Sequence, residues 1–156
     1  MPDAPTPTPT LAQRTIEIRR TFDAPRELVW AAWTDPDQLT QWWGPRGFTT
    51  PRDSITIDLR PGGVFALTMV GPDGTSFADN GHFHEVVEHE RLVFGGEVPG
   101  FELMTSATTE VTFTDLGGNR TEVVVRQTMM AAEQMPEMAR AGWSSQLNRL
   151  ADLLVA

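Results

Sequence analysis

The distribution of hydrophobic and polar residues changes along the chain, and each change marks a different kind of predicted element. Near the N-terminus the two kinds alternate over residues 15–22, TIEIRRTF, which predicts a β-strand. In residues 23–34 the spacing becomes helical, with Pro25 suited to the first helical position and Asp23 or Ala24 to the cap. The large apolar residues of this helix gather on one side: Leu28, Val29, Trp30 and Trp33.

A second short helix is predicted over residues 35–43. Asp35 is suited to cap it and Pro36 to open it, while the Gly-Pro pair at 44–45 ends it. Successive residues on a helix point about 100° apart, so the adjacent rings of Trp42 and Trp43 cannot share one direction. We expect one ring to face the interior and the other to lie on the flank or over an opening.

From residue 52 onward the pattern has a period of two, which is typical of strands. It covers residues 54–61, residues 62–75 with a turn at Gly71-Pro72-Asp73-Gly74, residues 76–97 with a turn near Glu88–Glu90, and residues 108–129 with a turn at Gly117-Gly118-Asn119. The alternation gathers side chains on one face of the first two stretches: Ile55, Ile57 and Leu59, then Phe65, Leu67 and Met69. Because the connections are short, we expect an antiparallel, meandering sheet.

A long amphipathic helix ends the chain. Pro136 opens it, and its apolar stripe recurs at helical spacing: Trp143, Leu147, Leu150 and Leu154. A curved sheet must bury its inner face, and this helix is the long element that can cover it. The pattern predicts an α+β fold in which a curved antiparallel sheet of about six to seven strands wraps around the C-terminal helix. The two short helices close one end, and a gap can remain between helix and sheet.

Length and N-terminal composition predict the domain organisation. A chain of 156 residues is the size of one domain and can bury a core without disulfides or metals. Its first ten residues, MPDAPTPTPT, are rich in Pro and Thr and have little to bury. We expect residues 1–13 to form a disordered tail and residues 14–156 to form a single domain.

Composition and charge narrow the expected compartment and partners. The chain has no cysteine, which removes disulfides, Cys-zinc sites and thiol nucleophiles and fits a reducing compartment. The N-terminus lacks signal-peptide features, and no apolar run approaches the roughly 20 residues that cross a bilayer. The net charge of −9, with scattered basic residues, repels phosphate backbones and anionic lipids. We therefore expect a cytoplasmic protein that binds neither nucleic acid nor membrane.

Candidate catalytic and metal-binding residues are few. His82 and His84 lie two apart on a predicted strand, hence on one face, where they could bind a metal or supply a base. A zinc site needs a further ligand, and His89 falls in a predicted turn. A hydrogen-bonded or solvated pair is the preferred interpretation. No G-x-S-x-G elbow or phosphate-binding glycine loop is present. We expect no metal and no cofactor, and binding without catalysis is the preferred interpretation.

The aromatic residues indicate an apolar site. The chain has five Trp and eight Phe but no Tyr, so a pocket built from them has the indole N–H as its main polar group. Trp30 and Trp143 are interpreted mainly as core, whereas Trp33 and one of Trp42 and Trp43 suit a dual role as core and ligand wall. A group of methionines, which adapt to irregular apolar shapes, lines a cavity entrance or simply fills the core: Met129, Met130, Met135 and Met138.

Several sequence blocks, in order, resemble one known family. They are FDAPRELVWAAWTDPDQLTQWWGP, DLRPGGVFALTM, GPDGT, GHFHEVV, ERLVF and AGWSSQLNRLADLL. Together they are similar to the domain named for the activator of Hsp90 ATPase homologue 1, within the START/Bet v 1-like (SRPBCC) helix-grip superfamily, over residues 14–155. The resemblance implies the helix-grip fold. It leaves the activity open, because superfamily members bind lipids, hormones or polyketides and some are cyclases.

Three functions remain open from the sequence. The leading hypothesis is that the protein binds a hydrophobic small molecule between sheet and helix. The alternatives are a cyclase-like or isomerase-like enzyme that uses His82 or His84 as a base, and a protein-binding module related to Hsp90 activation. Edge strands of the sheet could also pair in a homodimer. The predicted cavity walls are Trp33, Trp42 or Trp43, Phe65, Leu67, Met69, Phe83, Met104, Phe113, Trp143, Gln146 and Leu147.

Overall fold

The computed structural model describes residues 10–98 and 102–155. Over these residues, seven antiparallel strands form one sheet in the order β1-β7-β6-β5-β4-β3-β2. In chain order the elements are β1 (Ala12–Phe22), α1 (Arg26–Thr34), α2 (Pro36–Trp42), the short 3-10 helix η1 (Arg52–Ser54), β2 (Thr56–Ile57), β3 (Val64–Val70), β4 (Ser76–Val87), β5 (Arg91–Glu97), β6 (Met104–Gly117), β7 (Arg120–Ala131) and α3 (Met135–Leu154).

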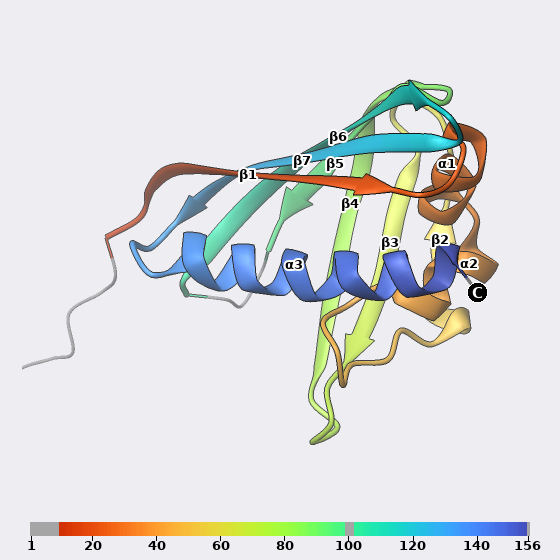
Figure 1. The fold of residues 1–156 in the computed structure, drawn as a ribbon. Helices are drawn as coiled ribbons and strands as arrows, with labels where there is room; N and C mark the ends of the chain where they lie inside the picture. The colour runs from red at the N-terminus through yellow and green to blue at the C-terminus, as the bar shows by residue number, and fades with distance from the viewer. Residues whose placement is uncertain (1–9, 99–101, 156) are drawn as a thin grey trace, which may run out of the picture.

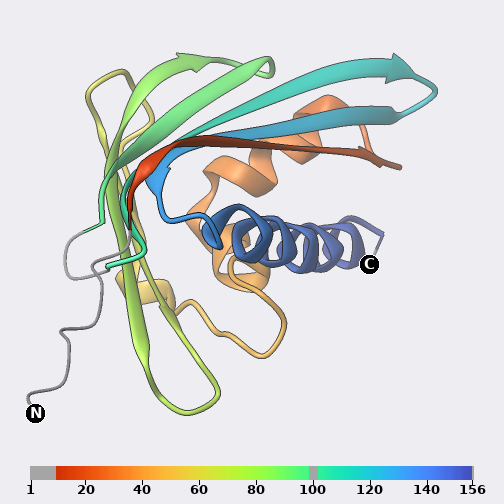
Figure 2. The same cartoon turned by 90° about the vertical axis from the view of Figure 1, so that its left-hand side faces the viewer.

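The sheet curves around α3, which lies along its concave side (Figures 1 and 2). Helices α1 and α2 lie at one end of the molecule, beside the C-terminal end of α3 (Figure 1). This arrangement confirms the predicted α+β architecture. No helix in the described ranges is both long and apolar enough to cross a membrane.

The connections between β3 and β7 confirm the predicted meander. The chain turns between β3 and β4, between β4 and β5, and between β6 and β7 within or next to the expected residues. His89 and Asn119 adopt positive φ angles of 64° and 59° in two of these turns. Asn tolerates this left-handed conformation better than most residues do, which agrees with its position in a turn.

The register of the sheet determines which side chains face α3. Phe65 and Leu67 on β3 are buried, and Leu67 lies directly opposite Asp79 on β4. Phe83, further along β4, lies opposite Phe94 on β5. Since every second residue of a strand points to the same side, Asp79 shares the concave face with Phe83.

Three details of the sequence prediction are wrong. Of residues 54–61, only Thr56 and Ile57 form a strand, and Leu59 is 40% exposed instead of sharing a buried face with Ile55. The chain turns back directly after this strand, with Gly62 at a φ of 82°, so there is no room for a longer one. β1 begins at Ala12, inside the predicted tail, because its first residues pair with the end of β7. The remainder of that tail, residues 1–9, lies outside the described residues. α1 begins one residue after Pro25, which takes the cap position.

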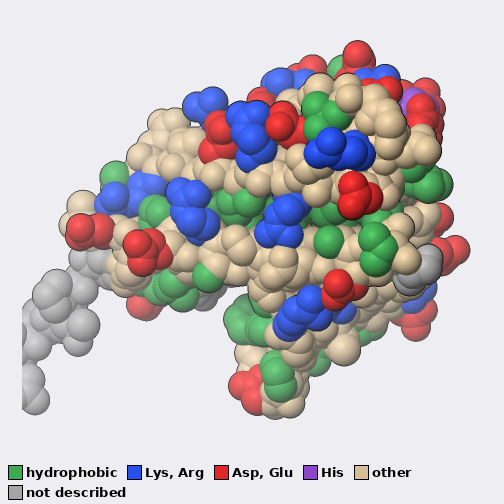
Figure 3. Space-filling view, viewed as in Figure 1, with side chains coloured by type: hydrophobic (Ala, Val, Ile, Leu, Met, Phe, Trp, Pro, Cys, Tyr) green, Lys and Arg blue, Asp and Glu red, His purple; other side chains and the backbone are tan. Residues whose placement is uncertain are grey.

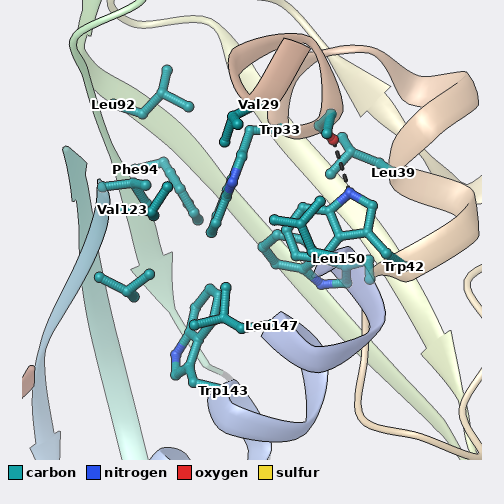
Figure 4. Close-up of a cluster of buried hydrophobic side chains, with 14 of the residues drawn as sticks. Val29, Trp33, Leu39, Trp42, Leu92, Phe94, Val123, Trp143, Leu147 and Leu150 are labelled. Atoms are coloured by element: carbon teal, nitrogen blue, oxygen red, sulfur yellow. Dashed lines mark hydrogen bonds between the residues drawn. The ribbon is translucent and has the colours of Figure 1, made fainter. Parts of the chain in front are cut away.

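The core is an aromatic cluster where the sheet, the short helices and α3 meet (Figure 4). The ring of Trp33 on α1 stacks on that of Trp143 on α3, with centroids 5.9 Å apart and planes inclined by 21°. The Trp42 indole N–H donates a 2.8 Å hydrogen bond to the carbonyl of Ala32, so its buried polar atom is satisfied. The cap of α2 is as predicted, since the Asp35 carboxylate accepts from the Asp37 amide at 2.9 Å. These contacts fill the end of the fold that the short helices close.

Candidate functional site

A hollow of about 280 Å³ remains between the sheet and the N-terminal half of α3, next to the aromatic cluster. A second hollow of the same size adjoins it and shares four of its lining residues, Met69, Asp79, Met104 and Gln127. Each is close to the lower limit of roughly 300 Å³ for ligand pockets. The two together extend from α3 across the inner face of β3, β4, β6 and β7.

Helix α3 contributes one wall of the first hollow. Six of its residues line the hollow at helical spacing: Met135, Met138, Ala139, Gly142, Trp143 and Gln146. Gly142 leaves open space, because a Cβ placed there would have only the Pro45 ring within 4 Å, at 3.9 Å. A larger side chain at this position would therefore extend into the hollow.

The segment after α2 contributes the opposite wall through Trp43 and Pro45. The planes of the Trp42 and Trp43 rings are inclined by 60°, and both rings are buried, with exposures of 0% and 3%. Neither ring lies on the exposed flank, because α3 covers the ring of Trp43: the centroids of Trp43 and Trp143 are 5.7 Å apart. The other expected position, over an opening, describes Trp43, which borders the hollow. Trp42 belongs to the core, and Trp43 has one side on the hollow.

Arg149 on α3 holds this wall in place. The two N–H groups of its Nη1 are shared among four carbonyls, those of Trp43 at 3.1 Å, Gly44 at 2.8 Å, Pro45 at 3.4 Å and Phe48 at 3.2 Å. Its Nη2 donates to the carbonyl of Gln41 at 3.2 Å. Desolvation by the surrounding protein is the main cause that lowers the pKa of the guanidinium, and repulsion from Arg46 is the smaller one. The planar group suits this role, because its donors have a rigid geometry.

Three polar side chains interrupt the apolar lining. The Gln127 Nε2 donates to the hydroxyl of Thr109 at 3.1 Å, which leaves its oxygen available. Gln146 is 6% exposed, and its Nε2 has no hydrogen-bond partner in the described structure. A buried amide without a partner costs about 1–3 kcal/mol, so Gln146 is suited to a partner that enters the hollow.

Asp79 is the third polar residue, and it is ionisable. Its side chain borders both hollows and keeps only partial contact with solvent. Desolvation raises its pKa from the usual 3.8 to about 6. An acid in this range can accept or release a proton near neutral pH, and in its charged form it attracts cations.

Some of the predicted wall residues border these hollows and others do not. Trp43, Met69, Met104, Trp143 and Gln146 line the first hollow. The remainder are buried within the core and have no side on it: Trp33, Trp42, Phe65, Leu67, Phe83, Phe113 and Leu147. Two of the four clustered methionines, Met135 and Met138, also line it. The division follows from position along the concave face. The aromatic residues lie at the end that α1 and α2 close, whereas the hollows lie nearer the start of α3.

His82 and His84 do not face the hollow. Both are exposed, and they border a separate depression on the outer side of the sheet with Val64 and Gly95. The ring of His89 packs edge-on against Trp30, with centroids 6.0 Å apart. Within the described ranges, no three His, Asp or Glu side chains come together as a possible metal site. A base inside the cavity therefore cannot come from these histidines.

Asp79, Gln127 and Gly142 are site residues that sequence reasoning did not identify. A signal for Asp79 was present, because it lies four residues before Phe83 and so shares its side of the strand. An acidic residue in an alternating strand is ordinarily assigned to the solvent face, which hides this signal. Gly142 had no signal, since its place at the hollow depends on how α3 docks.

The chain matches a protein family over most of its length. A family model described as "Activator of Hsp90 ATPase homolog 1-like protein" matches residues 23–155. No protein with a curated functional description matches the chain significantly.

Solved structures with the same fold come from several bacteria. A Mycobacterium smegmatis protein is 31% identical, with 90% of each chain covered and a TM-score of 0.74. A Chromobacterium violaceum protein is 28% identical, with 90% of this chain and 96% of that chain covered and a TM-score of 0.81. CalU16 of Micromonospora echinospora is 26% identical, with 94% of this chain and 84% of that chain covered and a TM-score of 0.67.

Proposed function

Since this chain belongs to the family of activator of Hsp90 ATPase homolog 1-like proteins and has the helix-grip fold, we propose that it binds a hydrophobic small molecule between the sheet and α3, without transforming it. The observation that carries the proposal is the pair of adjoining hollows beneath α3. Their lining is mostly Met, Trp and Ala. Such a surface favours apolar ligands, because each buried methylene contributes about 0.8 kcal/mol.

The lining suits a ligand of irregular shape. Met69, Met104, Met135 and Met138 surround the space. Methionine side chains are flexible and polarizable, so they can adjust to more than one apolar shape. Trp43 and Trp143 form the more rigid part of the wall, because their rings also pack into the aromatic cluster.

An enzymatic role is the second candidate, and Asp79 is the observation that favours it. A cyclase or isomerase needs a group that moves protons within the cavity. His82 and His84 face away, whereas Asp79 borders both hollows and has a pKa near 6. Such an enzyme would use the carboxylate of Asp79 as its base.

Native mass spectrometry of the gently purified chain tests the binding proposal. We expect a reproducible extra mass that disappears on denaturation. Gly142→Leu, which extends into the hollow, should lose this mass, while Gly142→Ala, which adds only a methyl group, should keep it. Retention in Gly142→Leu would place the molecule elsewhere. Two results together would overturn the proposal: a wild-type spectrum without extra mass, and tryptophan fluorescence that does not change when hydrophobic probes are added.

The other sequence-based predictions remain predictions. A homodimer through sheet edges would appear as twice the subunit mass in the same spectra, and fractionation of cells would test the cytoplasmic location. A role in Hsp90 activation requires that the purified chain stimulate the ATPase activity of Hsp90. We rank that role third, because the site described above provides no argument for it.

A further inference from the structure

We propose that the ligand of this cavity carries a protonated amine, which pairs with the Asp79 carboxylate, on an otherwise apolar body. The inference rests on the proposed function and adds the chemical class of the ligand. Its starting point is the position of Asp79, which borders both hollows and projects from the concave face of β4 opposite Leu67.

The carboxylate of Asp79 lacks a partner within the described part of the chain. Burial alone raises the pKa of this carboxyl group, and neither a hydrogen-bond donor nor a neighbouring charge lowers it. Asp and Glu are seldom buried unless they are paired, because desolvation of an unpaired charge is costly. A cation in the hollow would supply the missing partner.

The protein places no competing charge around Asp79. Residues from β3, β4, β6, β7, α3, the segment after α2 and the position directly after β5 line the two hollows, and among the described ones Asp79 alone is ionisable. An ammonium group that enters would therefore meet one negative charge and no positive charge. A carboxylate ligand such as a fatty acid would meet repulsion at the same point.

Two amides line the same hollow as the carboxylate and can complete the coordination of an ammonium group. Gln127 donates its N–H to Thr109 and so retains a free oxygen on the same wall. Gln146 is held by no hydrogen bond through Nε2, so its amide can turn to present oxygen. An ammonium has three N–H donors, and Asp79, Gln127 and Gln146 offer three acceptors.

The pH dependence of binding follows from the same arrangement. The proton on Asp79 must leave before an ammonium can pair with the carboxylate. With a pKa near 6, the ionised fraction is almost complete at pH 7.5 and falls roughly tenfold by pH 5. Aliphatic amines stay protonated throughout this range, so the change in affinity belongs to the protein.

Binding of three molecules that differ only in their polar end tests the inference. Decylamine, 1-decanol and decanoate are titrated into the full chain at pH 7.5, with calorimetry and tryptophan fluorescence as readouts. We expect decylamine to bind about tenfold more tightly than decanol, the order expected for a charge-assisted hydrogen bond. Decanoate should bind most weakly. The affinity for decylamine should fall about tenfold from pH 7.5 to pH 5.

Two variants separate the cavity from the surface charge. Acidic side chains are spread over the molecule, as on the face shown in Figure 3, and they attract amines non-specifically. Asp79→Asn should remove the preference for decylamine and its pH dependence. Asp53→Asn removes an equal charge from an exposed residue of η1 and should keep both.

The outcomes distinguish this inference from the function on which it rests. Equal binding of all three molecules by the wild type would overturn the amine assignment and leave a hydrophobic-ligand protein. An amine preference that persists in Asp79→Asn, or that disappears in Asp53→Asn, would also overturn it. Failure of all three molecules to bind would overturn the proposed function together with this inference.

Discussion

At the scale of single residues, the Asp79 carboxylate lowers the stability of the folded protein, and in our proposal it binds the ligand. Its carboxylate lies among apolar side chains, and no positive side chain lines the hollow within the described residues. Functional sites commonly hold such perturbed groups, because binding or catalysis uses the interaction that folding leaves unmet. The raised pKa of Asp79 therefore also predicts how the stability of the ligand-free protein depends on pH.

We predict that Asp79→Asn stabilises the protein at neutral pH and has little effect in acid. The folded protein binds the Asp79 proton up to a pKa of about 6, whereas the unfolded chain releases it near 3.8. Wild-type stability therefore falls as pH rises from about 4 to about 6, and the variant should avoid a loss of about 1–3 kcal/mol. Urea unfolding at pH 4 and pH 7.5 measures the difference. An equal difference at both values would show that charge is not its cause.

At the scale of elements, the site depends on how α3 holds the segment after α2. Five carbonyls of residues 41–48 accept hydrogen bonds from one guanidinium, that of Arg149. This segment carries Trp43 and Pro45, which form the wall opposite α3. The shape of the cavity is therefore set by a contact between two elements far apart in the sequence.

Replacement of Arg149 by Leu should destabilise the fold by about 2–3 kcal/mol, because several carbonyls lose their donor. Arg149→Lys should recover only part of the loss, since an ammonium cannot reach several acceptors with the same fixed geometry. The matched control is Arg46→Met, which removes an exposed 2.7 Å ion pair with Asp152 between the same elements. We expect its cost to stay below about 1 kcal/mol.

Urea unfolding gives these free energies, and hydrogen exchange shows where the structure loosens. Faster exchange in Arg149→Leu should be concentrated at the amides of residues 43–50. A uniform increase over the whole chain would show that Arg149 supports the fold in general, without a specific effect on this wall.

At the scale of the whole molecule, a half-filled interior links binding to stability. The end beneath α1 and α2 is packed with aromatic rings, while the end near the start of α3 keeps the hollows. A ligand that occupies the hollows binds the folded state and not the unfolded state. By mass action it therefore raises the free energy of unfolding.

Decylamine at about one hundred times its dissociation constant should stabilise the fold by about 2.7 kcal/mol. For a chain of this size, that corresponds to a rise in Tm of roughly 5–10 °C. Scanning calorimetry at pH 7.5 measures it, with Gly142→Leu as the variant in which the rise should vanish. A similar rise in Gly142→Leu would mean that decylamine binds outside the hollow.

The local pattern of the sequence was sufficient for the helices, most of the strands and their turns, because these depend on neighbouring residues. Period-two alternation and Gly-rich turns predict β3 to β7, and the helical spacing of Trp143, Leu147 and Leu150 predicts α3. The exception is β2, where a turn at residues 58–63 shortens the strand. The family could likewise be recognised, because its sequence blocks occur in order.

The tertiary structure decided which of the predicted wall residues surround the cavity, and it added Asp79, Gln127 and Gly142 to them. The β3–β4 connection is a five-residue loop, 71–75, closed by the Gly71 amide and the Thr75 carbonyl at 2.8 Å. It places Asp79 opposite Leu67, whereas a loop shorter by one residue would place Ala78 there and turn Asp79 outward. Trp43 and Gly142 reach the hollow only because α3 docks across the sheet. Register and docking depend on contacts between distant segments, which local patterns do not specify.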